Sequence, residues 1–598
     1  MKIKLLEITG KAREVILRYP MVLLMALLGS AGAICLYETN YSEPGFIAYS
    51  KFTMCSCLGI SLMFALKMLS QRIGKSYILE SAGIIFLVGF YFIFPDNNRD
   101  FTEVYQYIII VTFLLSHLFV SFAAFLNRNK EPNFWQYNKN LFVNTVLTII
   151  FTGVLTGGIE LAVLAVDKLF DFKFSESIYF DLFFFMAISG SCLNFLIFNE
   201  NGLPYLEKDS QYPVVLKFFT QFILIPLLLI YAIILYFYAF KILINWELPR
   251  GWVSYLVLAY SIVGILALLL VHPLKADHTK SWVKAFSRLF FYTIIPLVIL
   301  LFVAIFTRIL EYGYTEPRYF VLLLAVWLTG LVVYFVFNKK ASIRFIPVSL
   351  FVAGTFSLVF PYLNAFSVAK RSQKTELIKI LNNSNLLSQG KIDFNKKVSE
   401  QTINKITSQF VFLAERKEKD FLLNLISDAK IKNKLTEDFQ QFYFWNINNS
   451  LKNAFVNVEK KPGTSDYKQI ILESETDIMN IQDYQYMIRL QTYAKQLKEI
   501  NGDTFTIDNQ TKINGSDALR IILNSKEEID FIPAIHKLFQ ENTTAEGIAK
   551  LKEISVENNL GKYHIKIIFR DISKGKYSYS IHENFYYNDA VILIRENK

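Results

Sequence analysis

Long apolar runs separated by short polar turns fill the first 363 residues of the chain. Two of these runs, Val214–Ile244 and Trp252–Val271, are joined by the polar turn Asn245–Gly251. Each run matches or exceeds the roughly 20 apolar residues that a helix needs to cross a bilayer. Neither run keeps the polar face that a soluble surface helix presents to water. The pattern therefore predicts a transmembrane helical hairpin in this stretch.

The same pattern recurs along the chain, and it predicts an all-α polytopic transmembrane bundle of about 11 helices. The apolar segments lie near Met21–Tyr37, Phe52–Met68, Tyr77–Phe94, Val104–Leu126, Leu141–Val166, Ile178–Phe198, Val214–Ile244, Trp252–Val271, Leu289–Thr307, Tyr319–Phe337 and Phe345–Leu363. Because the number is odd, we expect the two ends of the chain to lie on opposite sides of the membrane.

After residue 363 the periodicity changes twice, which predicts a soluble α+β region. Apolar residues recur at helical spacing near Leu377 and again from Val398 to Leu435. From Tyr467 onward short apolar or alternating runs are bounded by Gly, Asn and Asp, as in strands, and a helix interrupts them near Glu527–Phe539. We therefore divide the chain into a transmembrane domain (1–363), a helical connector (364–460) and a sheet-rich extracytoplasmic α+β module (461–598).

Charge supports this division and gives an orientation. Residues 1–363 contain 28 Lys and Arg, and 20 of them lie at the N-terminus and in the loops on its side of the membrane. Short cytoplasmic loops carry such an excess of positive residues. The N-terminus is then cytoplasmic and the C-terminal module is extracytoplasmic. No compact basic patch or stacking motif accompanies the net charge of +11, so we expect no nucleic-acid partner.

Two ionisable residues within the apolar segments are candidate functional residues. Glu160 lies in the fifth segment and His117 lies in the fourth. A carboxylate within a span usually faces a cavity or a partner, although Glu160 could instead reach the outer interface and pair with Lys168. His117 could relay protons, or it could make a single interhelical hydrogen bond with a neighbouring serine.

Two outer turns hold the other candidates. The first contains Glu247 and Arg250 between two Trp residues, so it either anchors the helices at the interface or binds a ligand. The second is the segment 308–319, where two acids and two arginines either form a polar site or neutralise one another in a structured turn. Its candidate residues are Arg308, Glu311, Glu316 and Arg318.

A search for catalytic motifs gives no enzyme class. The chain has no Walker A run, no GxSxG elbow, no HExxH and no CxxC pair. All four cysteines (Cys35, Cys55, Cys57 and Cys192) lie in apolar segments, where small packing residues are common. We therefore predict no catalytic residue, no metal site and no cofactor, and we interpret the protein as a non-enzyme.

Several runs resemble a known family. They are LKFFTQFILIPLLLIYAIILYFYAFKILINWELPRGWVSYLVLAYSIVGILALLL, GGIELAVLAVDKLF, RILEYGYTEPRYFVLLLAVWLTGLVVYF and AFSVAKRSQKTELIKIL. They are similar to a family of uncharacterised bacterial multi-pass membrane proteins that carry a numbered domain of unknown function. The resemblance covers most of residues 1–400 and implies a location in the bacterial cytoplasmic membrane. It implies no activity, substrate or site residue, and the sheet-rich module shares no such resemblance.

These observations favour a polytopic membrane protein that acts as a non-enzymatic sensor or scaffold of the envelope. Its partners would be the lipid bilayer and an envelope protein or lipid that binds the C-terminal module. The first alternative is a transporter or flippase-like carrier, which predicts discontinuous helices and a polar cavity near the bilayer midplane. The second alternative is a membrane-embedded enzyme acting on lipid-linked substrates at the segment 308–319.

Overall fold

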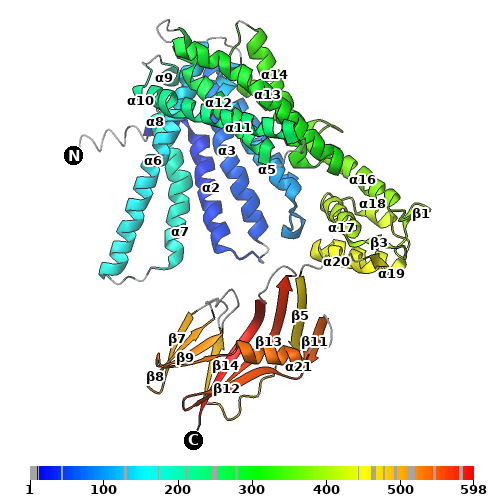
Figure 1. Ribbon diagram of the computed structural model, residues 1–598. Helices are drawn as coiled ribbons and strands as arrows, with labels where there is room; N and C mark the ends of the chain where they lie inside the picture. The colour runs from blue at the N-terminus through cyan, green and yellow to red at the C-terminus, as the bar shows by residue number, and fades with distance from the viewer. Residues whose placement is uncertain are drawn as a thin grey trace. The chain divides into compact units, whose positions relative to one another are not determined.

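In the computed structural model the chain forms two compact units, Met1–Val458 and Glu459–Lys598 (Figure 1). The structure describes residues 10, 13–41, 43, 45–126, 131–170, 172, 174–208, 212–245, 252–276, 281–338, 340–441, 444–459, 467–475, 478–490, 495–509, 519–542, 547–577 and 584–597.

Ten helices within the described residues are long and apolar enough to cross a membrane. They are Pro20–Glu38, Gly45–Ile73, Ser76–Ile93, Glu103–Phe125, Glu131–Phe170, Glu176–Phe198, Val214–Ile242, Val253–Leu274, Ala285–Tyr312 and Glu316–Phe337. An eleventh apolar helix, α15 (Phe345–Val359), is shorter at 15 residues. The predicted bundle of about 11 membrane helices followed by an α+β region is thereby confirmed.

The element bounds show where these helices begin and end. In chain order they are α2 (Pro20–Glu38), α3 (Gly45–Ile73), α4 (Ser76–Ile93), α5 (Glu103–Phe122), α6 (Glu131–Phe170), α7 (Glu176–Phe185), α8 (Ser191–Phe198), α9 (Leu203–Leu206), α10 (Val214–Phe218), α11 (Ile225–Asn245), α12 (Trp252–Val271), α13 (Ser281–Tyr312) and α14 (Glu316–Phe337). Single π-helical turns, Met186–Gly190 and Phe219–Leu224, interrupt two of the spans. Pro296 lies inside α13, where neighbouring helices in a bundle can satisfy the carbonyl that proline leaves free.

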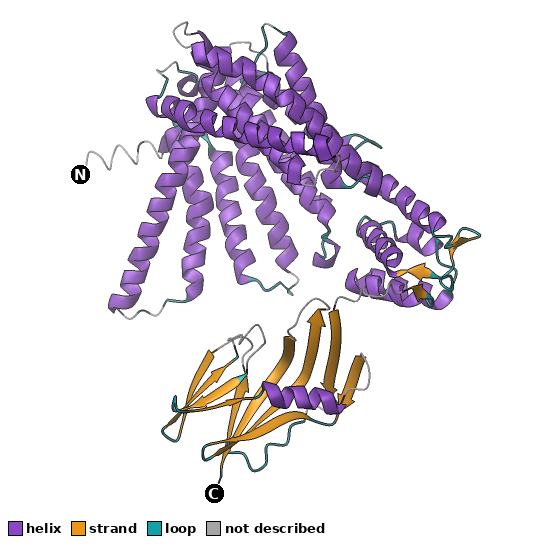
Figure 2. Cartoon of the chain, viewed as in Figure 1, coloured by secondary structure: helices purple, strands orange, loops and turns teal. Residues whose placement is uncertain are grey.

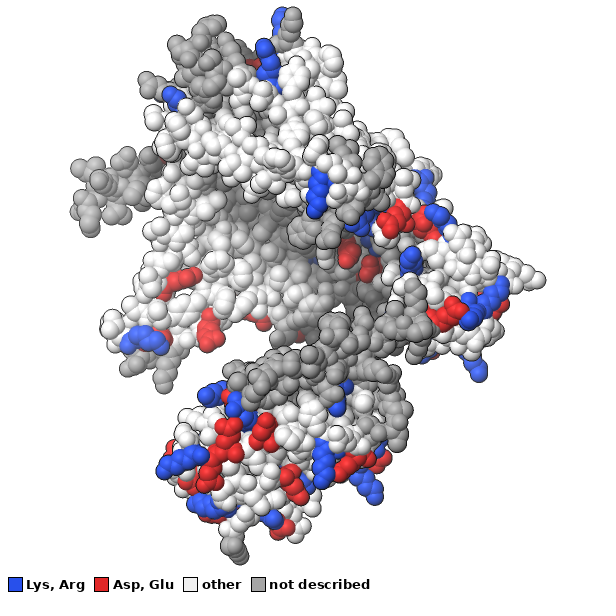
Figure 3. Space-filling view, in the orientation of Figure 1, with Lys and Arg blue, Asp and Glu red and all other residues white. Residues whose placement is uncertain are grey.

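The surface of the membrane helices is apolar on its outside as well as in its core. Side chains such as Ile149 and Val154 on α6 are 68% and 72% exposed, and many large apolar side chains of α11 are also exposed. Few charged side chains interrupt this part of the surface, whereas they gather on the remaining helices and on the strand-rich unit (Figure 3). A bundle with this outer surface is stable in lipid, because lipid tails cover the apolar groups.

A helical subdomain follows α15 and belongs to the same unit. It consists of α16 (Ala365–Asn383), α17 (Glu400–Glu415), α18 (Lys419–Asn424), α19 (Ala429–Gln441), α20 (Phe444–Ala454) and the short strand pairs β1–β2 (Leu387–Ser388, Lys391–Ile392) and β3–β4 (Val398–Ser399, Val458–Glu459). Its core includes Leu381, Phe410 and Leu435, each fully buried. Side chains cap the starts of two helices. The Asn364 side chain accepts a hydrogen bond from the backbone amide of Ser367 at the start of α16, and the Ser399 hydroxyl accepts one from the backbone amide of Thr402 at the start of α17.

The second unit contains two sheets and one helix (Figure 2). Its elements are β5 (Tyr467–Ser474), β6 (Tyr486–Leu490), β7 (Lys495–Ile500), β8 (Asp503–Asp508), β9 (Arg520–Leu523), β10 (Glu527–Asp530), α21 (Ile532–Asn542), β11 (Gly547–Leu551), β12 (Ile554–Leu560), β13 (Tyr563–Tyr577) and β14 (Asn584–Glu596). One sheet has the order β11-β5-β13-β14-β6 with β12 also paired to β13, and the other has the order β10-β9-β8-β7.

Strand β13 organises the larger sheet. One edge of β13 pairs first with β12, through Tyr563–Phe569, and then with β5, through Asp571–Tyr577. Its other edge pairs with β14 along nearly its whole length. The predicted helix near Glu527–Phe539 is partly wrong, because Glu527–Asp530 form strand β10 and the helix begins at Ile532. The predicted boundaries of the three domains remain a prediction.

Candidate functional site

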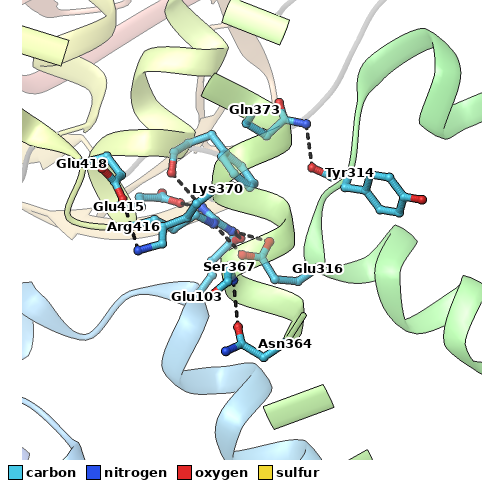
Figure 4. A network of polar contacts seen from close by, with 11 residues as sticks. Glu103, Tyr314, Glu316, Asn364, Ser367, Lys370, Gln373, Glu415, Arg416 and Glu418 are labelled. Carbon is cyan, nitrogen blue, oxygen red and sulfur yellow. Dashed lines mark hydrogen bonds and ion pairs between the residues drawn. The ribbon is translucent and has the colours of Figure 1, made fainter. Parts of the chain in front are cut away.

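A buried ion pair joins the membrane helices to the helical subdomain. Glu316 is the acidic residue in the first turn of α14, and its side chain is fully buried. Arg416 follows the end of α17 and donates from Nε to Oε1 at 2.7 Å and from Nη2 to Oε2 at 2.8 Å (Figure 4). Such a bidentate, charge-assisted contact is strong and fixes the relative angle of its two planar groups. The carboxylate also lies at the positive end of the α14 dipole.

The remaining contacts of Arg416 involve its third guanidinium nitrogen, its planar face and a longer approach to Nη2. Nη1 donates to the carbonyl of Phe412 at 3.0 Å and to Glu415 at 3.1 Å. The guanidinium carbon lies 3.4 Å from the centroid of the Phe412 ring, and Glu103 of α5 approaches Nη2 at 3.9 Å. Burial raises the pKa of the Glu415 carboxyl, although the neighbouring guanidinium opposes this effect. Three carboxylates therefore surround one arginine.

The backbone after α17 explains why Arg416 points at α14. Lys417 has a φ of 61°, and its backbone amide donates a hydrogen bond to the carbonyl of Ala414. The backbone amide of Glu418 donates to the carbonyl of Leu413. This is the Schellman pattern, which ends a helix with one left-handed residue that is usually glycine. The turn separates Arg416 from Glu418, whose carboxylate binds Lys370 at 3.1 Å and Lys374 at 2.6 Å on α16.

The electrostatic state of Glu418 follows from these two lysines. Burial alone would raise the pKa of the Glu418 carboxyl, but its hydrogen bonds to Lys374 and Lys370 lower it below its ordinary value. The carboxylate is therefore charged at neutral pH and links α16 to the start of α18. Together with the Arg416 contacts, it joins α5, α14, α16 and α17 in what we call the docking network, comprising Glu103, Glu316, Lys370, Lys374, Gln373, Glu415, Arg416 and Glu418.

Gln373 of α16 links the docking network to the turn between α13 and α14. Its amide nitrogen donates to the carbonyls of Tyr312 at 2.9 Å and Tyr314 at 2.7 Å, and Ser372 accepts from the amide of Tyr314. Gly313 lies between these residues with φ of 71°, and a Cβ there would meet the Ser372 hydroxyl at 2.8 Å. The turn and α16 therefore approach more closely than any residue with a side chain would allow.

The predicted site at 308–319 is only partly assembled around this network. Glu316 belongs to it, and Arg318 caps the adjacent turn by donating to the carbonyls of Tyr312 and Gly313. Arg308 is half-buried and Glu311 is exposed on α13, and both interact electrostatically with Arg318 of α14. Whether these side chains act on a ligand remains a prediction.

The structure separates the other candidate residues from this network. Glu160 is half-buried on α6 and forms no hydrogen bond or ion pair with any described residue, while Lys168 pairs with Asp167 at 3.4 Å. His117 lines a cavity between α3, α5, α6 and α8. Glu247 and Arg250 lie outside the described residues.

Sequence reasoning missed Arg416, Gln373 and Glu103. Arg416 lies in the run Glu415–Asp420, which reads as a solvated charged segment, and nothing in its spacing indicates a partner 100 residues earlier. The available signal was position, because Glu316 starts a membrane helix where a buried acid needs a cation. Among the described residues no group of three or more His, Cys, Asp or Glu is arranged to hold a metal ion.

Comparisons with known proteins place the chain in a family. It is 24% identical over 397 residues to an uncharacterized protein, PM1469, of Pasteurella multocida (strain Pm70), and the alignment covers 64% of this chain and 62% of that protein. The chain thus spans less than two thirds of that relative. No solved structure matches. The model of the family described as Domain of unknown function (DUF4153) matches residues 23–390, more than half of the chain. The predicted resemblance is therefore confirmed, and this multi-pass membrane protein belongs to the DUF4153 family.

Proposed function

We propose that the protein is a non-enzymatic scaffold or sensor of the bacterial envelope. Its helices would lie in the cytoplasmic membrane with the N-terminus inside, and its strand-rich module would bind an envelope protein or lipid outside. The observation that carries the proposal is the buried pair between Glu316 and Arg416. This pair ties the end of α17, in the helical subdomain that follows the membrane helices, to the start of α14, as a scaffold requires.

The chemistry of this pair favours structure over catalysis. Both oxygens of Glu316 accept hydrogen bonds from one guanidinium, and the side chain has no exposed surface. A general acid or base must reach its substrate within hydrogen-bond distance or through one water molecule. Glu316 is therefore a poor candidate for the membrane-embedded enzyme that the sequence leaves open.

The module offers surfaces that suit a protein partner. Met487 on β6 is 61% exposed, and Ile478 and Ile481 just before β6 are 85% and 53% exposed. Strand β6 is an edge of the larger sheet among the described residues. Edge strands present unpaired backbone groups to which an extended peptide can add, with neighbouring apolar side chains giving selectivity. This combination supports binding of an extended segment of an envelope protein.

Orientation is the first experimental test. All native cysteines lie in apolar segments, so a variant with these four replaced gives a clean background. Asn558→Cys on β12 and Lys75→Cys before α4 are both exposed positions. A membrane-impermeant maleimide added to intact spheroplasts should label Asn558→Cys and spare Lys75→Cys, with the reverse result in inverted vesicles. Labelling of Asn558→Cys from the cytoplasmic side alone would refute the proposal.

The binding role needs a second measurement. Photo-crosslinkers placed at Met487 and Ile478 in the full chain should yield a discrete envelope partner, whereas one at Lys537 on α21 serves as a matched exposed control. Equal products from all three positions would contradict specific binding. Transport that continues after the module is deleted would instead favour the carrier alternative.

One observation favours that carrier as the second candidate function. A cavity of about 430 Å³ lies among the membrane helices and is lined by His117 and several hydroxyl side chains. One wall comes from the π-helical segment Met186–Gly190, and such segments often occur at functional sites. Substrate uptake into proteoliposomes that depends on His117 would support this candidate over the scaffold.

A further inference from the structure

A polar cleft lies at one end of the membrane helices, where several of them begin or end. Its volume is about 690 Å³. Arg18, just before α2, lines it together with Lys67 and Arg72 near the end of α3 and with Pro204 of α9, which follows α8. The ends of membrane helices lie at the level of the lipid headgroups, and basic pockets at this level bind headgroup phosphates. The place and charge of the cleft therefore suit an anion.

Two of the three cations on the wall are paired with carboxylates. Arg72 forms an ion pair with Glu207, which follows α9. Lys67 binds Glu80 of α4 at 3.3 Å. Both pairs are largely shielded from water, because each of the four side chains is less than one fifth exposed. These two carboxylates balance the charges of Arg72 and Lys67.

Arg18 is the cation without a counter-ion on this wall. It is half-buried and forms no ion pair or hydrogen bond with any described residue. A Cβ added to Gly202 would lie 2.9 Å from Nη1 of Arg18 and 3.1 Å from Nε2 of Gln71. Oε1 of Gln71 also accepts a hydrogen bond from the amide of Leu203 at 2.8 Å. The guanidinium and the Gln71 amide therefore lie against the same short stretch of backbone.

Lys67 lies within reach of the same ligand. It is one turn before Gln71 on α3, and residues four apart share a helix face with their Cβ atoms about 5–6 Å apart. Gln71 in turn lies beside Arg18 at Gly202. The Lys67 ammonium uses two of its three donors on Glu80 and Ser76, which leaves one for a ligand. A phosphate has several oxygens and can accept from both cations at once.

We propose that this cleft binds the phosphate diester of a membrane phospholipid, with Arg18 as its counter-ion and Lys67 as a second donor. The charges of Arg72 and Lys67 are balanced, so one positive charge remains. A phosphate diester carries one negative charge, whereas a phosphate monoester carries nearly two at neutral pH. Arginine also binds phosphate with two parallel hydrogen bonds.

The neighbouring surface favours a lipid as the source of this phosphate. Leu17, next to Arg18, is 72% exposed, and Ile73, next to Arg72, is 42% exposed. Acyl chains can therefore contact the protein beside the cleft. The site lies at the same end of the helices whichever side of the membrane that end faces, so the proposal is independent of the orientation proposed above.

The test measures lipid binding to the full chain in mild detergent by native mass spectrometry. Phosphatidylglycerol should bind at least about tenfold more tightly than a diacylglycerol with the same chains, because only the first has the phosphate. Arg18→Gln should lower the affinity for phosphatidylglycerol about tenfold, as the loss of a charged hydrogen bond implies. The same variant should unfold at the wild-type temperature without lipid, since no described carboxylate loses its partner.

Matched variants and a soluble competitor sharpen the test. Arg13→Gln removes the same charge from an exposed position five residues earlier, and it should change the affinity by less than about twofold. Arg18→Lys keeps the charge and should bind more tightly than Arg18→Gln. Equal losses in Arg13→Gln and Arg18→Gln, or equal binding of the two lipids, would overturn the proposal. Displacement of the lipid by millimolar inorganic phosphate would overturn the lipid assignment and identify a soluble phosphate as the ligand.

Discussion

Two charge networks in this protein join distant parts of the chain, one buried and one exposed to water. In the first unit Arg416 binds Glu316, and their side chains are 2% and 0% exposed. In the second unit Lys562 binds Asp503 and Glu596 at 3.1 and 3.0 Å, with its own side chain 52% exposed. The contacts are alike in length, but water screens only the second network.

This difference in exposure to water sets how much each network contributes to stability. An exposed pair contributes about 0–1 kcal/mol, because water solvates both charges when they separate. A buried pair that loses one partner leaves a charge without water or a counter-ion, which costs about 3–5 kcal/mol. The docking network should therefore be sensitive to substitution, and the Lys562 network should be tolerant except at extreme pH.

The largest expected effect is at Arg416. Arg416→Ala should destabilise docking of the helical subdomain by about 3–5 kcal/mol, since Glu316 would remain buried and unpaired. Limited proteolysis of α16–α20 in the purified full chain measures the change. The double variant Glu316→Leu with Arg416→Met should recover much of the loss, because no charge is left buried. A double variant as unstable as Arg416→Ala would contradict this account.

Gly313 should give the next largest effect. Gly313→Ala combines a positive φ with a close approach to Ser372 and Gln373, and we expect a loss of about 2 kcal/mol. Gly390 has a similar φ of 75° but nothing within 4 Å of an added Cβ, so Gly390→Ala should cost about 1 kcal/mol. Thermal unfolding of the two variants compares them, and equal losses would show that the contact with α16 does not matter.

A pH-dependent effect is expected in the exposed network. Hydrogen bonds from Asn524, Tyr563 and Lys562 lower the pKa of Asp503 to about 2. Because the folded pKa lies below the ordinary value of about 3.9, the stabilisation is present above pH 4 and is lost as the pH falls toward 2. The protection of the β8 and β13 amides from hydrogen exchange should therefore fall as the pH falls from 4 toward 2. Asp503→Asn should abolish the pH dependence. A transition near pH 3 that persists in this variant would mean that another titrating group causes it.

The smallest expected effect is at Lys537. It pairs with Glu541 one turn away on α21 at 3.7 Å, and both side chains are more than half exposed. Lys537→Ala should change the free energy of unfolding by less than about 0.5 kcal/mol. Chemical denaturation of the full chain measures this, and a loss above 1 kcal/mol would mean that surface pairs matter more here than screening allows.

The membrane helices could be predicted from the sequence because each is encoded locally. A run such as Trp252–Val271 has no polar face, and burial in lipid requires no knowledge of its neighbours. The helix at Ile532 shows the limit of this reasoning. Glu527–Asp530 fit the start of a helical pattern, but β9 offers them a strand partner, and pairing decided their conformation.

The docking network could not be predicted, because it depends on contacts between residues far apart in sequence. Glu316 was a candidate on account of its position, yet its partner lies in a charged run that looks solvated. His117 was a candidate from its place in an apolar segment, whereas the Thr148 hydroxyl, which has no partner among the described residues, was hidden, since only the structure shows which hydroxyls bond to their own helix. The local sequence pattern predicts the membrane helices, whereas the docking network becomes visible only in the three-dimensional structure.

The pairing of β5 with the last part of β13 has a consequence for biosynthesis. Residues Tyr467–Glu473 of β5 find their antiparallel partners only at Asp571–Tyr577, near the end of the chain. A sheet built from such non-local contacts forms slowly, because a long loop must close first. During synthesis the early strand β5 would therefore wait, unpaired with β13 and prone to aggregation, until residues 571–577 have left the ribosome. A chaperone for that interval is a natural requirement of this topology.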